Sequence, residues 1–181
     1  TFPGNYGNFI IHLENEKIEI TKHISPLSIK CSMKGSVYFK TSNGNYCVTP
    51  GNYFIMNEGQ ECEGRIDEKT ESFSLYFDTK FADSVFRNLI SPSDKILNYS
   101  YFPKNLPLDF FEKLYPHNNI LSPLIMKLHL ASKVNYDDDN WINEKFYLLL
   151  EKMLILHKNL FEEINKLPPL KLSTKIELYK R

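Results

Sequence analysis

The sequence lacks the cysteine patterns that hold metals, disulfides or redox centres. Its three cysteines are odd in number and widely spaced, and no C-x-x-C pair occurs among Cys31, Cys47 and Cys62. This pattern excludes a legible disulfide framework, a zinc ribbon and a dithiol redox motif. We therefore expect three reduced thiols that pack as small side chains in a cytoplasmic protein.

The chain also lacks an excess of charge of either sign. Lysine plus arginine equals aspartate plus glutamate, at 22 each. A domain that binds DNA by itself carries a basic excess, so we expect no such binding from this chain alone. No apolar run approaches the roughly 18 residues of a membrane helix, and no secretory signal opens the sequence. We expect no membrane partner.

Histidine is sparse where a β-barrel would hold a metal ion. The five histidines stand apart from one another, at His12, His23, His117, His129 and His157. The sequence has no His-x-His pair, so the combination of such a pair with a nearby glutamate and a later histidine, which would hold one ion, is missing. His12 and His23 can approach each other across the first strands, but two histidines without placed carboxylates make a weak site. We predict no metal and no cofactor.

Motifs for covalent catalysis are missing as well. There is no G-x-S-x-G elbow, no Cys–His signature and no glycine loop that would cradle a phosphate. We therefore predict no catalytic residue and no enzymatic activity.

Strand patterns fill the region between residues 9 and 78. Apolar and polar residues alternate from Leu27 to Lys34, and Asn43-Gly44 and Pro50-Gly51 are turn pairs. About six to eight short strands with tight turns and no interleaved helix predict an antiparallel sandwich or barrel. Residues 1–8, which contain two glycines and a proline, are predicted to be an arm without its own core.

After residue 78 the pattern changes from strands to helices. We predict a short helix and loops over residues 79–120, with a possible helical turn at 109–114, and a further helix that begins at Ser122-Pro123. Apolar residues three or four apart then mark a helix of roughly 25 residues from Trp141 to Leu167. The short connection predicts that the last two helices are antiparallel neighbours over 121–167. The fold class is therefore α+β, a β domain followed by a helical pair.

The apolar stripe of the long helix is wider than its short neighbour can cover. A monomer would leave a few hundred Å² or more of apolar surface open to water, which single soluble domains rarely tolerate. We therefore predict a symmetric homodimer in which the long helix packs against its twin. The predicted interface consists of Phe146, Leu149, Met153, Leu156, Leu160 and Ile164.

The sequence closes on what looks like the start of another helix. Thr174 and Glu177 have the spacing of a capping box, and the chain then runs out. We expect this chain to be cut off after the start of this helix and, since it opens on threonine, also at its N-terminus; an ordinary unstructured terminus is the alternative.

With the long helix and two prolines before it, the C-terminal segment resembles the join between the sensor and DNA-binding halves of AraC/XylS-type bacterial transcription regulators. The matching residues are Ser173, Thr174, Glu177, Leu178, Tyr179 and Arg181, with Lys175 where arginine is usual.

A second resemblance lies in the strand region. The order Gly44 through Pro50-Gly51 is similar to an inter-strand turn of cupins, the jelly-roll barrels that form the sensor domains of AraC/XylS regulators. The family resemblance implies a cupin barrel over 9–78 that senses an effector, dimerisation helices over 121–167, and a linker with the first turns of a truncated DNA-binding domain over 168–181. DNA would be bound only through a C-terminal helix-turn-helix domain that this sequence does not include. A cupin enzyme and a small sugar-binding module are the alternatives.

An effector site in such a barrel needs aromatic residues and a few convergent polar groups. Residues on the candidate strands that fit this description are Lys30, Tyr38, Tyr46, Tyr53, Ser74 and Tyr76. The alternative is that the tyrosines face solvent or close the core. Alternation does not decide between these interpretations, because both faces of the strands carry aromatic residues.

Overall fold

The computed structural model describes residues 7–90, 109–134, 138–166 and 174. Most of the predicted arm (1–8) and nearly all of the predicted linker with its capping box (168–181) therefore lie outside the described residues. In the described part, two antiparallel sheets and three helices form the α+β fold that the sequence predicts.

The strands form two separate sheets. The five-stranded sheet has the order β1 (Phe9–Asn15), β8 (Thr70–Tyr76), β3 (Ser28–Lys34), β6 (Asn52–Met56) and β9 (Leu114–Pro116). The four-stranded sheet has the order β2 (Ile18–Ser25), β7 (Gln60–Ile66), β4 (Val37–Thr41) and β5 (Gly44–Val48). Strand pairing among the described residues does not join the sheets into a closed barrel, so the predicted barrel is an open two-sheet sandwich.

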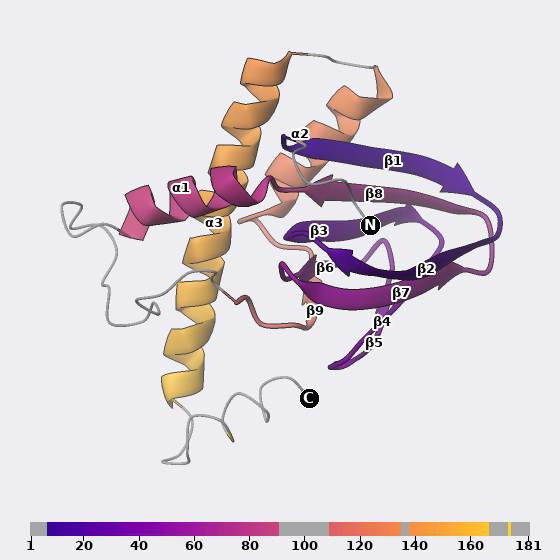
Figure 1. Cartoon of the computed structure of the whole chain (residues 1–181), viewed down its shortest axis with the longest axis horizontal. Coiled ribbons are helices and arrows are strands. Elements are labelled where there is room, and N and C mark those ends of the chain that lie inside the picture. The colour runs from indigo at the N-terminus through magenta and orange to yellow at the C-terminus, as the bar shows by residue number, and fades with distance from the viewer. Residues whose placement is uncertain (1–6, 91–108, 135–137, 167–173, 175–181) are drawn as a thin grey trace.

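Three helices cover the outer face of the five-stranded sheet, opposite the four-stranded one (Figure 1). They are α1 (Thr79–Ile90), α2 (Ser122–Lys133) and α3 (Asp139–Lys166). Both α1 and α2 contact α3. The predicted pair of helices is therefore part of a three-helix layer.

The strands of the central sheet bury side chains on both faces. On β6, Tyr53 and Ile55 join the core beneath the helices, whereas Phe54 and Met56 join the core between the sheets. This follows from the two-residue period of a strand. The alternation separates the interior into a helix-side core and an inter-sheet core.

Segment 109–116 differs from the sequence prediction. The possible helical turn at 109–114 is absent: Phe110 and Phe111 are buried in chain that is neither helix nor strand, and β9 follows. Asn57 exchanges two hydrogen bonds with the backbone of Phe110, at 2.8 and 2.9 Å. Backbone pairing with a buried amide and with β6 replaces the local hydrogen bonds of a helix.

The stripe of α3 is covered within one chain. The six residues predicted to meet a second copy are each 0–9% exposed, and the ring of Phe146 lies 5.1 Å from that of Phe77. That expectation assumed that α2 alone would cover the stripe, whereas α1, the five-stranded sheet and residues 110–121 also pack against it. These six side chains are therefore core residues of one chain, and the dimer itself stays a prediction.

Gly35 lies in the turn between β3 and β4 and offers a test of how that turn packs against residues 69–70. Its φ is +72°, and a Cβ there would lie 2.7 Å from the carbonyl oxygen of Lys69 and still closer to Thr70 Oγ1. Gly59 has a similar φ of +77° but open space around it. We expect Gly59→Ala to cost about 1 kcal/mol through left-handed strain alone. Gly35→Ala should cost at least about 2 kcal/mol more, because the backbone of residues 69–70 must also move.

Urea denaturation of both variants measures the difference directly. Equal losses for the two would show that the β3–β4 turn does not pack against residues 69–70 as described.

Candidate functional site

Lys30 lies in the middle of the five-stranded sheet with its side chain in the inter-sheet core. It is 2% exposed and pairs with Phe54 of β6 on one side and Ser74 of β8 on the other. Its Nζ lies 3.7 Å from the ring centroid of Tyr76 and 6.0 Å from that of Phe39, which belongs to the other sheet. The ammonium group is thus held by the faces of two aromatic rings.

No carboxylate among the described residues forms an ion pair with Lys30, and no hydrogen-bond acceptor in that part of the chain binds it. Burial raises the pKa of the nearby Cys31 thiol to about 12, while the charge of Lys30 acts in the opposite direction. Burial also raises the pKa of Cys62, so neither thiol supplies a counter-charge at neutral pH. A buried cation without an anionic partner is costly. The fold therefore presents a positive charge that an anion would neutralise.

Aromatic rings surround this cation. Tyr46 stacks on Phe54 with ring centroids 4.3 Å apart, and Phe9 stacks on Tyr76 at 4.6 Å. The rings near Lys30 are thus aromatic, and the polar residues on the same face are Ser28 and Ser32 along β3 and Ser74 on β8. One cation in an apolar lining has the composition of a site for a small amphipathic anion.

The six residues predicted for the effector site divide into two groups. Lys30, Ser74 and Tyr76 come together, and Tyr46 joins them through its stacking on Phe54. Tyr38 and Tyr53 lie elsewhere. Tyr38 is 38% exposed on the outer face of the four-stranded sheet, and Tyr53 is buried in the helix-side core, where its hydroxyl accepts a hydrogen bond from Asn118. Burial raises the pKa of Tyr53, so its phenol stays neutral.

The sequence model of the AraC-like ligand binding domain matches residues 22–139. The chain belongs to the AraC-like ligand-binding domain family. A search of curated proteins finds no match.

Among solved structures, this AraC-like domain resembles two of ToxT from Vibrio cholerae. ToxT of strain O395 bound to (E)-4-(8-methylnaphthalen-1-yl)but-3-enoic acid has a TM-score of 0.51 and 10% identity, covering 84% of this chain and 58% of that one. Wild-type ToxT of strain SCE256 bound to an unsaturated fatty acid has a TM-score of 0.50 and 12% identity, covering 87% and 56%. A cupin-2 domain protein from Shewanella frigidimarina covers 38% and 68%, with a TM-score of 0.35 and 14% identity. The chain spans little more than half the length of ToxT.

A groove of about 650 Å³ lies over the outer face of the four-stranded sheet of this AraC-like domain. It is lined by Tyr38, Lys40, Glu63 and Arg65, among others. Its cations are already engaged: Lys40 binds Glu63 at 2.8 Å, and Arg65 binds Asp67 at 2.9 Å. The Lys40–Glu63 hydrogen bond raises the pKa of Lys40 and lowers that of Glu63. Compared with Lys30, this groove offers an anion less unsatisfied charge.

No helix in the described part of the chain is long and apolar enough to cross a membrane.

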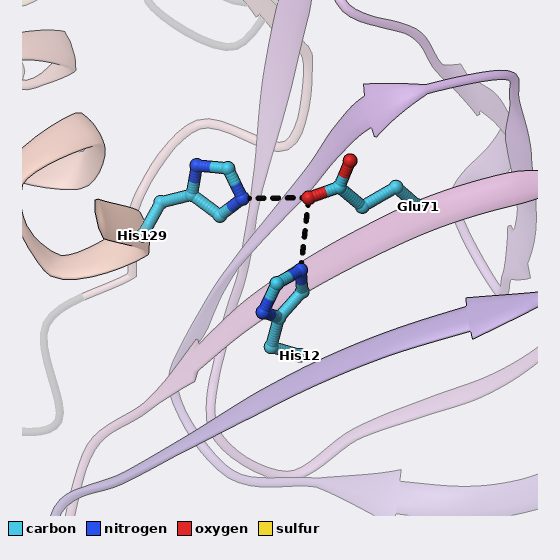
Figure 2. Close-up of side chains that lie close together, drawn as sticks. All are labelled: His12, Glu71 and His129. Atoms are coloured by element: carbon cyan, nitrogen blue, oxygen red, sulfur yellow. Dashed lines mark hydrogen bonds and ion pairs between the residues drawn. The ribbon is translucent and has the colours of Figure 1, made fainter. Parts of the chain in front are cut away.

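The sequence did not indicate one cluster that the fold assembles. His12 of β1, Glu71 of β8 and His129 of α2 meet on the helix side of the five-stranded sheet (Figure 2). Hydrogen bonds to Lys133, His129 and His12 hold the pKa of Glu71 at about 2, so its carboxylate is ionised. From the sequence, His12 was expected to approach His23, but His23 lies on β2, in the other sheet. No spacing motif links the three residues, because the register of β1 on β8 and the docking of α2 bring them together.

Because Lys30 has no anionic partner among the described residues, we predict that removing its charge does not destabilise the ligand-free domain. Lys30→Met keeps the aliphatic stem and removes the buried charge, at the loss of a cation–π contact of about 2 kcal/mol or less. We expect the free energy of unfolding of the ligand-free domain to stay equal or to rise. Lys40→Met, on the exposed face, is the matched control and should change it little.

Chemical denaturation of both variants without ligand checks this. A loss of more than about 2 kcal/mol on Lys30→Met would show that the cation is a structural element of the fold.

Proposed function

We propose that this domain senses a small amphipathic anion, with a carboxylic acid as the leading candidate, and that Lys30 binds the anionic group between the two sheets. The observation that carries the proposal is the buried ammonium without a carboxylate partner among the described residues. Tyr46, Phe54 and Tyr76 would contact the apolar part of the effector. The two ToxT ligands are a fatty acid and an aryl butenoic acid, each an apolar body with one carboxylate, and they support the choice of class.

The family supports a regulatory role for this binding in place of catalysis. In our proposal, effector binding changes how a helix-turn-helix half, joined through segment 168–181, meets DNA in the cytoplasm. Strand β8 supplies a route: Ser74 and Tyr76 lie beside Lys30, while Phe73 and Leu75, which alternate with them along the strand, pack beneath the helices. An effector that binds one arrangement of β8 more tightly than another shifts the helix layer with it.

Ligand-dependent thermal stability tests the proposed function. An unsaturated long-chain fatty acid, below its micelle concentration, should stabilise the domain, by about 2.7 kcal/mol at 100 times Kd. Its methyl ester has the same apolar body without the charge and should stabilise it far less. Lys30→Met should abolish the difference between acid and ester, and Lys40→Met should preserve it.

Equal stabilisation by acid and ester, or an unchanged response in Lys30→Met, would refute Lys30 as the anion-binding group. A response to a neutral monosaccharide alone would favour the sugar-binding module.

We further propose that the helix layer joins two copies of the chain, as the family resemblance implies. The contact would lie on the exposed face of α2, because the predicted interface side chains of α3 are already buried. Met126, Leu130 and Val134 follow one another at four-residue intervals and are 42%, 61% and 74% exposed. Such a row lies on one face of the helix end, and its apolar area is best covered by the same row of a second copy.

Light scattering at tens of micromolar tests this assembly. The parent should be a dimer, and the double variant Met126→Glu with Leu130→Glu should be a folded monomer, because four carboxylates per dimer would face an apolar contact. Lys17→Glu, in the exposed connection between β1 and β2, is the control and should remain dimeric. A monomeric parent, or a double variant that still dimerises, would contradict the proposed contact.

A further inference from the structure

Two imidazoles and one carboxylate converge where α2 docks on the five-stranded sheet. Glu71 Oε1 lies 2.9 Å from His12 Nε2 and 2.8 Å from His129 Nε2. One ligand atom from each residue can be chosen so that all three lie within 4.8 Å of one another. In Figure 2 both rings point at the carboxylate from different elements, His12 from a strand and His129 from a helix. The site is mostly enclosed, with His129 5% exposed.

This donor set suits a divalent transition metal. Two imidazole nitrogens and one carboxylate oxygen are the protein ligands of many zinc and iron(II) sites that keep a position open for water or substrate. Metal–ligand bonds of about 2.1 Å place neighbouring ligand atoms about 3.4 Å apart in a tetrahedral site. An outward movement of about half an ångström from the present distances would therefore admit an ion.

The hydrogen bonds around His12 support a cation at this point. The Ser132 hydroxyl donates to the carbonyl oxygen of His129 at 2.7 Å, so toward His12 Nδ1, 3.3 Å away, it is an acceptor. His12 Nδ1 therefore donates to Ser132 Oγ, and the other ring nitrogen, Nε2, faces Glu71 Oε1 at 2.9 Å. Ser132 thus orients the ring as outer-sphere partners of metal ligands do.

Lys133 is the group that competes with an ion. Its Nζ lies 2.9 Å from the same Glu71 oxygen, but its side chain is 45% exposed and can turn into solvent. An ion has a route to the site, since His12 and Ser132 line a surface groove of about 760 Å³ between β1, α2 and α3. Metal binding and the Lys133 ion pair are therefore alternative states of one carboxylate.

We propose that His12, Glu71 and His129 bind one divalent transition-metal ion, of which Zn²⁺ is the leading candidate, and that the bound ion cross-links α2 to strands β1 and β8. The site is separate from Lys30, which lies on the other face of the sheet. It amends the sequence-based expectation of no metal, which considered spacing along the chain and could not include a ligand from α2.

Cobalt(II) serves as the spectroscopic probe, added to full chain that has been stripped with a chelator and carries no histidine tag. We expect one Co²⁺ per chain, with the visible absorption of a tetrahedral site, and displacement of that signal by Zn²⁺. His12→Gln and Glu71→Gln should each abolish the absorption, while His117→Gln, which changes a histidine outside the cluster, should keep it. Lys133→Met should tighten binding by up to about fivefold, because it removes the competing cation.

Each variant is first compared with the parent in chelator, so that a folding defect is recognised by its circular dichroism. If either variant is misfolded, His12→Asn and Glu71→Asp replace it, and weakened absorption is again expected. Absence of Co²⁺ binding at 1 mM in both the parent and Lys133→Met would overturn the site. Absorption that survives in folded His12 and Glu71 variants, or weaker binding in Lys133→Met, would also overturn it.

Discussion

The central strands of the five-stranded sheet bury both of their faces, and the rest of the domain is arranged to cover them. Residues 28–32 of β3 are all buried, Phe73 and Leu75 of β8 join the helix-side core, and β6 supplies side chains to both cores. A sheet that is buried on both faces needs a layer on each side. The helices cover one face and the four-stranded sheet covers the other. Neither cover could be removed without exposing large aromatic side chains such as Phe54 or Phe73.

Lys30 places a charge at the middle of this arrangement. Ser28 and Ser32, two residues away on the same face of β3, are buried and uncharged, whereas the charged side chain of Lys30 lies in the inter-sheet core. A position that violates a local rule without internal compensation is where function is expected to have outweighed stability. The exposed cations Lys40 and Arg65 follow the opposite pattern, each with its own carboxylate. The contrast is why the buried lysine carries the functional interpretation.

Residue patterns were sufficient for the fold class and for the order of most elements. Period-two alternation located strands such as β3, and the apolar spacing from Trp141 onward located α3. The same patterns could not orient the tyrosines, because Tyr38, Tyr46 and Tyr53 occupy strands with aromatic residues on both faces. They also could not show that the stripe of α3 is covered inside one chain, since that depends on how segments 79–90 and 110–121 pack against it.

The histidine–carboxylate cluster shows a different limit. His12, Glu71 and His129 are brought together by strand register and helix docking, which leave no periodic trace along the chain. Lys30 could be selected from the sequence only as a polar residue on a candidate strand, because its burial depends on the second sheet. A histidine on a helix face has many ordinary explanations, so only its neighbours in space distinguish it.

The two faces of β8 have a consequence for genetics. Tyr76 lies beside Lys30, and Phe73, three residues earlier, packs among the side chains beneath the helices. A selection for regulators that ignore their effector, or that act without it, should recover substitutions on both faces of this strand. Helix-side alleles would then be mistaken for a second effector pocket if they were mapped on the sequence alone. Mapped on the fold, they fall on the opposite side of one strand from the residues around Lys30.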